Sequence, residues 1–147
     1  MQIVKTGIIS AAIGVITFLG GCAVSDLPLK ETVWVQIPDS TVQPSPAGRN
    51  EPAWFLIDRG NRLTGNGGVN QIIGSVKTAE DGKLVFNPPA TTRMAGPNLP
   101  SENAFLKVLE STRSYQLSGE TLTLLDENGK PIATFKAGPH EWKYLEQ

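Results

Sequence analysis

The sequence predicts an α+β fold that is mostly antiparallel β: a curled sheet or incomplete β-barrel with one packed α-helix. Three observations support this fold class. Short apolar segments alternate with turn residues, and the chain holds 15 glycines and 11 prolines, which favour turns. Only one segment shows the helical spacing of apolar residues. Strands come in runs before and after that segment, which is typical of α+β domains.

The first half of the domain is expected to consist of strands joined by turns. Glu31–Ile37 alternates in a strand pattern, with Trp34 on the face opposite Val33. Ala53–Asp58 is apolar on both faces, which predicts a strand covered on both sides. Gly74 is expected to interrupt a later strand. The further strand segments of this half are residues 62–65 and 71–78, and residues 80–86 are expected to form a turn followed by a strand.

The single predicted helix is Pro100–Thr112. Phe105, Val108 and Leu109 recur in it at helical spacing. Asn98 or Ser101 suits the N-cap, and Glu102 suits the first turn because a carboxylate there complements the helix dipole.

Three strands are expected after the helix, at Ser111–Leu117, Thr121–Leu125 and Pro131–Lys136. The Asn128-Gly129 pair between the last two favours a two-residue type I′ hairpin turn. An antiparallel arrangement follows from such short connections.

The N-terminus has the features of a secretory signal. Lys5 precedes an uncharged apolar run, Gly7–Leu19, which is shorter than the ~20 residues that cross a bilayer. The run ends in a motif that resembles a bacterial lipobox: Leu19, Gly20, Gly21 and Cys22. The resemblance implies cleavage before Cys22 and lipid, palmitate included, on its thiol. The alternatives are a secreted protein with a chance cysteine and an uncleaved helix that stays as an anchor.

The expected organisation is a signal peptide at 1–21, a lipidated tether at 22–30, one domain at 31–137 and a tail at 138–147. Cys22 is the only cysteine, so lipidation would leave no thiol for a disulfide. In bacterial lipoproteins an Asp directly after the cysteine favours the inner membrane, and here that residue is Ala23. The resemblance to lipoproteins therefore implies the outer membrane, facing the periplasm. The long loop Pro38–Pro52 holds four prolines, and it is either a functional element or a mobile one.

Composition argues against several kinds of partner and cofactor. The formal net charge is −1 and no basic run is present, so nucleic acid is not an expected partner. The glycines of Gly65–Val76 are not followed by a helix, as a dinucleotide site requires, or by Gly-Lys-Ser/Thr. They are expected to permit sharp turns instead. His140 is the only histidine, so neither a catalytic set nor a metal site is expected, and no cofactor is implied.

Two polar residues stand in short stretches between core segments. Arg93 could bind an anion or a carboxylate of a partner, and Asn70 could contribute to the same contact. The alternative is that both satisfy backbone groups and hold two loops together. Most aromatic residues lie in strand or helix patterns and are expected in the core. Trp142 and Tyr144, on the tail, could instead dock on the barrel or on another protein.

Four stretches in a fixed order carry a family resemblance: "GNGGVN" from Gly65, "TTRMAG" from Thr91, the helix residues Phe105–Leu109, and "LTLLDENGK" from Leu122. In this order and spacing the chain resembles the META domain, or HslJ-like, family of small envelope proteins. The resemblance covers Trp34 to Ala137.

The resemblance implies an incomplete β-barrel with one helix and a non-catalytic envelope role, in some members linked to stress. Family members usually have a cysteine at the positions of Val69 and Gly96, and those two cysteines are expected to form a disulfide in the family. This chain lacks both. We therefore expect Val69 to pack near Gly96, so that the contact between the two loops is kept without its covalent link.

The function expected from these observations is a lipid-anchored, non-catalytic binding or accessory module, with an envelope protein as its partner and a role in envelope stress. The alternative is a carrier or sensor that holds a lipid or small apolar ligand in the barrel groove. A hydrolase built on His140 is the least supported hypothesis.

Overall fold

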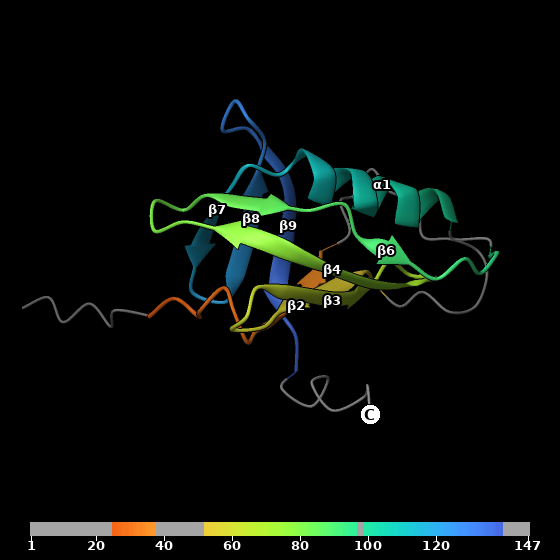
Figure 1. Ribbon diagram of the computed structural model, residues 1–147. Coiled ribbons are helices and arrows are strands. Elements are labelled where there is room, and N and C mark those ends of the chain that lie inside the picture. Colours follow the sequence, from red (N-terminus) through yellow and green to blue (C-terminus); the bar gives the residue numbers. More distant parts are fainter. Residues whose placement is uncertain (1–24, 38–51, 97–98, 140–147) are drawn as a thin grey trace, which may run out of the picture.

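The computed structural model describes residues 25–37, 52–96 and 99–139. These residues form nine strands and one helix (Figure 1). The strands are β1 Val33–Gln36, β2 Trp54–Ile57, β3 Arg62–Asn66, β4 Gln71–Thr78, β5 Leu84–Phe86, β6 Ala90–Thr91, β7 Ser114–Ser118, β8 Thr121–Leu125 and β9 Pro131–Ala137, and the helix is α1 Leu99–Ser111.

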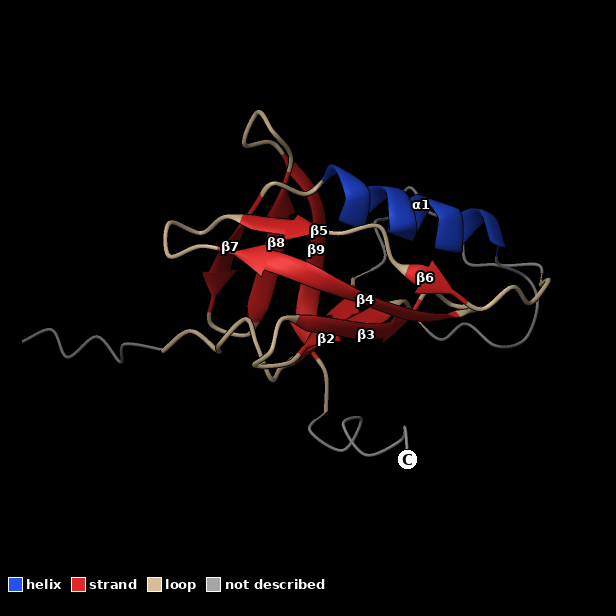
Figure 2. Cartoon of the chain, viewed as in Figure 1, coloured by secondary structure: helices blue, strands red, loops and turns tan. Residues whose placement is uncertain are grey.

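The strands form an antiparallel sheet that curls into a nearly closed barrel (Figure 2). Eight strands follow the order β5-β4-β3-β2-β1-β9-β8-β7, and the short β6 pairs with β4. The two edge strands approach each other at the seam. There, Leu84 N–H donates to the Arg113 carbonyl at 3.1 Å, and Tyr115 N–H donates to the Gly82 carbonyl at 3.0 Å. The expected fold class, with its single packed helix, is therefore confirmed.

Aromatic side chains fill the interior of the barrel. Trp34, Phe55 and Phe135 are fully buried. The Phe55 ring meets Phe86 edge-on at 5.5 Å between centroids and Phe135 at 5.1 Å. These residues belong to the centre of the core. Their edge-to-face pairs add to the free energy gained by burying the rings.

The register of the strands defines two ends of the barrel. Helix α1 lies over the first, which we call the helix end. The helix begins beside the β3–β4 loop, where Asn70 N–H donates to the Glu102 carboxylate. It ends beside Leu125, the last residue of β8, whose carbonyl accepts from Arg113 N–H at 2.9 Å. Phe105 and Leu109 point from α1 into the core.

The opposite end, which we call the N-terminal end, is closed by residues 25–32. Leu29 is 6% exposed and belongs to the core, and its carbonyl accepts from Trp34 Nε1 at 2.9 Å. Figure 1 shows this segment on the side of the sheet away from α1. Residues 25–30 were expected to belong to a tether, but the burial of Leu29 makes them part of the domain.

Two expectations about the strands of the first half are wrong. The strand β2 is not equally covered on both faces, because Phe55 and Ile57 are fully buried while Leu56 is only half-buried. Gly74 does not interrupt β4, which pairs through it with Leu63. A side chain at Gly74 would press on Pro89, whose Cα lies 3.3 Å from an ideal Cβ position; the glycine therefore makes room for the chain that leads into β6.

The β8–β9 hairpin is present, but its turn is not type I′. That type needs positive φ at both central residues. Here Gly129 has φ of 73° and Asn128 is not in the left-handed region. Gly129 N–H donates to the Asp126 carbonyl at 3.1 Å, as in a turn followed by a glycine bulge. The Asp126 carboxylate also accepts from Asn128 N–H at 2.9 Å, which stabilises this alternative.

Candidate functional site

Glu102 is a buried carboxylate at the start of α1. It shares a helix face with Phe105 and Leu109 because the three are spaced by three and four residues, and it is 3% exposed. Its Oε2 accepts from the backbone N–H of Val69 at 3.1 Å and of Asn70 at 2.7 Å. Its Oε1 accepts from Asn70 Nδ2 at 2.8 Å. The carboxylate thus ties α1 to the β3–β4 loop by three charge-assisted hydrogen bonds.

Asn70 connects the same loop to the chain after β6. Its side chain is 3% exposed, and its Oδ1 accepts from Thr92 Oγ1 at 2.8 Å and from Met94 N–H at 2.7 Å. Its Nδ2 donates to the Met94 carbonyl at 3.3 Å as well as to Glu102. Because both lone pairs and both N–H groups are used, Asn70 is a scaffold residue and its amide is not left to bind a ligand.

The glycine cluster makes room for this network. An ideal Cβ at Gly67 would lie 2.5 Å from Cγ of Glu102, so any side chain there would displace the carboxylate. Gly68 has φ of 108°, a conformation that favours glycine. Gly68 N–H also donates to Asn66 Oδ1 at 2.7 Å. The glycines therefore serve a close approach between loop and helix, in agreement with the expected structural role.

Val69 and Gly96 lie in contact, as expected. An ideal Cβ at Gly96 would be 3.0 Å from Cγ1 of Val69 and 3.8 Å from its Cβ. The second distance matches the usual Cβ–Cβ separation across a disulfide. The geometry therefore suits a cysteine pair, and the presence of such a pair in relatives stays a prediction.

Residues 91–96 form a loop that we call the 91–96 loop. The hydrogen bonds from Asn70 to Thr92 and Met94 fix its backbone. The side chains of residues 92–95 are nevertheless exposed, and Met94 is 56% exposed. Arg93 is exposed, and among the described residues its guanidinium has no hydrogen-bond or ion-pair partner. The loop is therefore a stretch of fixed backbone that presents a cation and an apolar side chain to its surroundings.

Several predicted site residues lie outside the described residues. They are the signal and lipobox residues Leu19, Gly20, Gly21 and Cys22, the histidine His140, and the tail aromatics Trp142 and Tyr144. The same holds for residues 38–51 of the proline-rich loop and for Asn98. Within 25–37, 52–96 and 99–139, no group of three or more histidine, cysteine or carboxylate side chains could hold a metal ion, and no helix is long and apolar enough to cross a membrane.

The role of Glu102 differs from the one expected. The sequence predicts a first-turn carboxylate that complements the helix dipole, whereas in the structure Glu102 is buried and holds the β3–β4 loop. The burial of Glu102 is indicated in the sequence by its spacing from Phe105 and Leu109, which places the carboxylate on the same helix face as these two core residues.

The family model of the META domain matches residues 28–139. The chain belongs to the META domain family. No curated protein matches it. Its META domain is similar to a solved protein from Burkholderia xenovorans, with 27% identity, a TM-score of 0.56, and coverage of 75% of this chain and 83% of that one.

Two further solved structures share the fold of this META domain. A duf4847 family protein from Bacteroides vulgatus is 14% identical with a TM-score of 0.57, covering 75% of this chain and 94% of that one. A third protein, solved by NMR, is 23% identical with a TM-score of 0.52, covering 74% and 91%. These likenesses support the barrel with its single helix.

Proposed function

We propose that this META domain protein is a lipid-anchored, non-catalytic binding module that contacts another envelope component through the 91–96 loop. The anchor is the lipid on Cys22 that the lipobox implies, with the domain in the periplasm at the outer membrane. A role in the envelope stress response belongs to the same proposal.

One observation carries the proposal. The side chains of residues 92–95 are exposed while the backbone beneath them is held by Asn70 and, through it, by Glu102. A loop that is ordered before binding loses less conformational entropy when a partner binds. Arg93 offers an exposed guanidinium, carried on a fixed backbone, for a carboxylate of the partner, and Met94 offers an adaptable apolar contact.

The packing of the interior favours this surface over the carrier alternative. Phe55, Phe86, Phe105 and Phe135 contact one another across the barrel. An apolar ligand in the interior would have to displace these rings, and displaced core aromatics cost several kcal/mol. A surface contact requires no such change.

Site-specific photocrosslinking in intact cells tests the proposal. A photoreactive amino acid at Ala95, which is exposed in the same loop and leaves Arg93 in place, should give a discrete adduct with one envelope protein. The same amino acid at Glu127, exposed on the β8–β9 turn, should not give that adduct. The Cys22→Ser variant, which cannot take lipid, should lose the adduct from position 95.

Equal adducts from positions 95 and 127 would contradict a contact through the 91–96 loop. Apolar lipid recovered with the purified protein, together with no adduct at 95, would favour the carrier function instead.

A further inference from the structure

Two exposed arginines lie at the N-terminal end of the barrel: Arg59 in the β2–β3 turn and Arg62 at the start of β3. The side chain of Arg59 is 90% exposed against 43% for its partner Glu31, and that of Arg62 is 82% exposed against 28% for its partner Asp58. The carboxylates therefore lie closer to the domain than the guanidinium groups that they hold.

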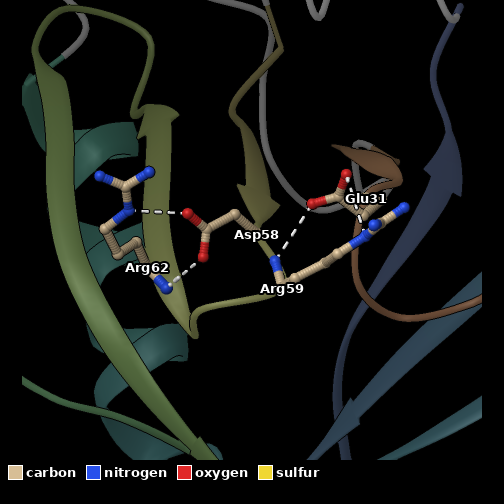
Figure 3. Close-up of polar contacts among 4 residues, drawn as sticks. All are labelled: Glu31, Asp58, Arg59 and Arg62. Carbon is tan, nitrogen blue, oxygen red and sulfur yellow. Dashed lines mark hydrogen bonds and ion pairs between the residues drawn. The ribbon is translucent and has the colours of Figure 1, made fainter.

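The carboxylates engage these arginines through Nε and through the backbone. Arg62 Nε donates to Asp58 Oδ2 at 2.7 Å, and Arg62 N–H donates to Asp58 Oδ1 at 2.8 Å. Arg59 N–H donates to Glu31 Oε1 at 3.1 Å, and its Nε lies 4.0 Å from Glu31 Oε2. Figure 3 shows the contacts of Asp58 reaching Nε and the backbone nitrogen of Arg62, and not its terminal guanidinium nitrogens. The terminal nitrogens, which suit bidentate phosphate recognition, are thus not used in the contact with Asp58.

The same end of the barrel receives the chain from the lipid-bearing cysteine. Gly119 N–H donates to Asp26 Oδ1 at 2.6 Å, and Leu27 N–H donates to the Gly119 carbonyl at 3.0 Å, so the chain is fixed to the β7–β8 turn from residue 26 onward. Glu31 N–H then donates to the Ile57 carbonyl at 2.8 Å, beside the β2–β3 turn. Both turns therefore lie at the N-terminal end.

The chain from Cys22 to Asp26 is four residues long and reaches at most about 14 Å. A lipid on Cys22 would hold the N-terminal end within that distance of the membrane surface. With a much longer tether, the domain could present any face to the bilayer.

From these observations we propose that the N-terminal end of the barrel lies on the membrane surface, with Arg59 and Arg62 against the phosphates of anionic phospholipid headgroups. This inference rests on the lipid anchor of the proposed function. It places the 91–96 loop, which is fixed to the helix end through Asn70, away from the bilayer and open to a periplasmic partner.

Fluorescence quenching by headgroup-labelled lipid tests the orientation in the full-length lipidated protein. Cys22 is the only cysteine, so once it carries lipid a single introduced cysteine takes the label alone. The two label positions are exposed and lie at opposite ends: Ser118→Cys at the β7–β8 turn and Glu127→Cys at the β8–β9 turn. In vesicles of phosphatidylethanolamine and phosphatidylglycerol, we expect strong quenching at 118 and little at 127.

The arginine contact is tested by the Arg59→Gln/Arg62→Gln double variant. Headgroup contact should weaken about fivefold for each arginine removed, which lowers the quenching at 118. Vesicles of phosphatidylcholine alone, or added salt, should have the same effect on the parent protein. The matched control is Lys107→Gln/Lys130→Gln, which removes two exposed positive charges elsewhere and should leave the quenching unchanged.

The outcomes separate the inference from the proposed function. If mass spectrometry finds Cys22 without lipid, the anchor and the orientation both fall. If Cys22 carries lipid and quenching is equal at 118 and 127, the orientation alone is overturned. This comparison uses the protein with both arginines in place, so it does not depend on the folding of an arginine variant. Selective quenching at 118 that is the same in the arginine and lysine variants overturns the arginine contact.

Discussion

The Oε1 atom of Glu102 lies 2.8 Å from Nδ2 of Asn70, across 32 residues of sequence. This hydrogen bond joins the first turn of α1 to the β3–β4 loop inside the domain. Asn70 passes the restraint on to the 91–96 loop through Met94 N–H. A buried pair therefore determines the shape of an exposed surface, and its removal has measurable consequences.

Replacing Glu102 by Gln should destabilise the protein by about 1.5–3 kcal/mol, because hydrogen bonds to a charged acceptor are lost and an amide N–H group is left facing donors. Urea unfolding of the purified protein measures this change. Glu110→Gln removes an exposed carboxylate of the same helix and should stay within about 0.5 kcal/mol of the parent. Equal effects of the two variants would show that the buried carboxylate has no special role.

Replacing Gly67 by Ala should cost on the order of 1–3 kcal/mol, because the new methyl group overlaps the Glu102 side chain. In a Glu102→Ala background the same change should cost much less, since the obstructing atoms are gone. A double-mutant cycle on unfolding free energies measures the difference. Strict additivity would contradict the proposed contact.

The Val69→Cys/Gly96→Cys double variant should form a disulfide and raise the unfolding free energy by about 2–4 kcal/mol. The ideal Cβ position at Gly96 is 3.8 Å from Cβ of Val69, and the Gly96 backbone is outside the left-handed region, so a cysteine fits. Thermal unfolding with and without reductant measures the gain, with each single variant as a control. If the cysteines stay reduced under oxidising conditions, the two loops are not held as described.

The Asp58–Arg62 pair predicts a pH dependence. The backbone N–H of Arg62, and then its guanidinium, lower the pKa of Asp58, and the same pair raises the pKa of Arg62. A carboxyl whose pKa is lowered on folding adds stability above its unfolded pKa, and this stability is lost as the pH falls through the folded pKa.

Asp58→Asn should therefore lower the unfolding free energy at pH 7, and the difference from the parent should shrink below about pH 4. Urea unfolding at several pH values measures it. The effect is expected to be small because the pair is largely exposed and screened. A difference that grows toward acid pH would contradict this assignment.

Regular elements with a clear pattern could be predicted from the sequence. β4 at Gln71–Thr78 and β8 at Thr121–Leu125 have the expected bounds, because apolar alternation and flanking turn residues mark both ends. β6 could not be predicted, because two residues after Pro88 and Pro89 carry no periodicity. Its pairing with β4 comes from the tertiary fold.

The site was predicted in part. Asn70 and the contact of Val69 with Gly96 were expected to join two loops, and the structure brings these residues together. The inward turn of Glu102 was not expected, because local rules assign a carboxylate in a first turn to the helix dipole. Its partner is 32 residues away, and a distant partner is not visible in local sequence patterns.

The measurement that tests the central claim most directly is photocrosslinking from position 95 in cells that carry either Glu102→Gln or Glu110→Gln. If the buried carboxylate holds the 91–96 loop in its binding shape, the adduct falls sharply in Glu102→Gln and persists in Glu110→Gln, at matched protein levels. An adduct of equal yield in both variants would contradict the claim that the Glu102–Asn70 bond prepares this loop for its partner.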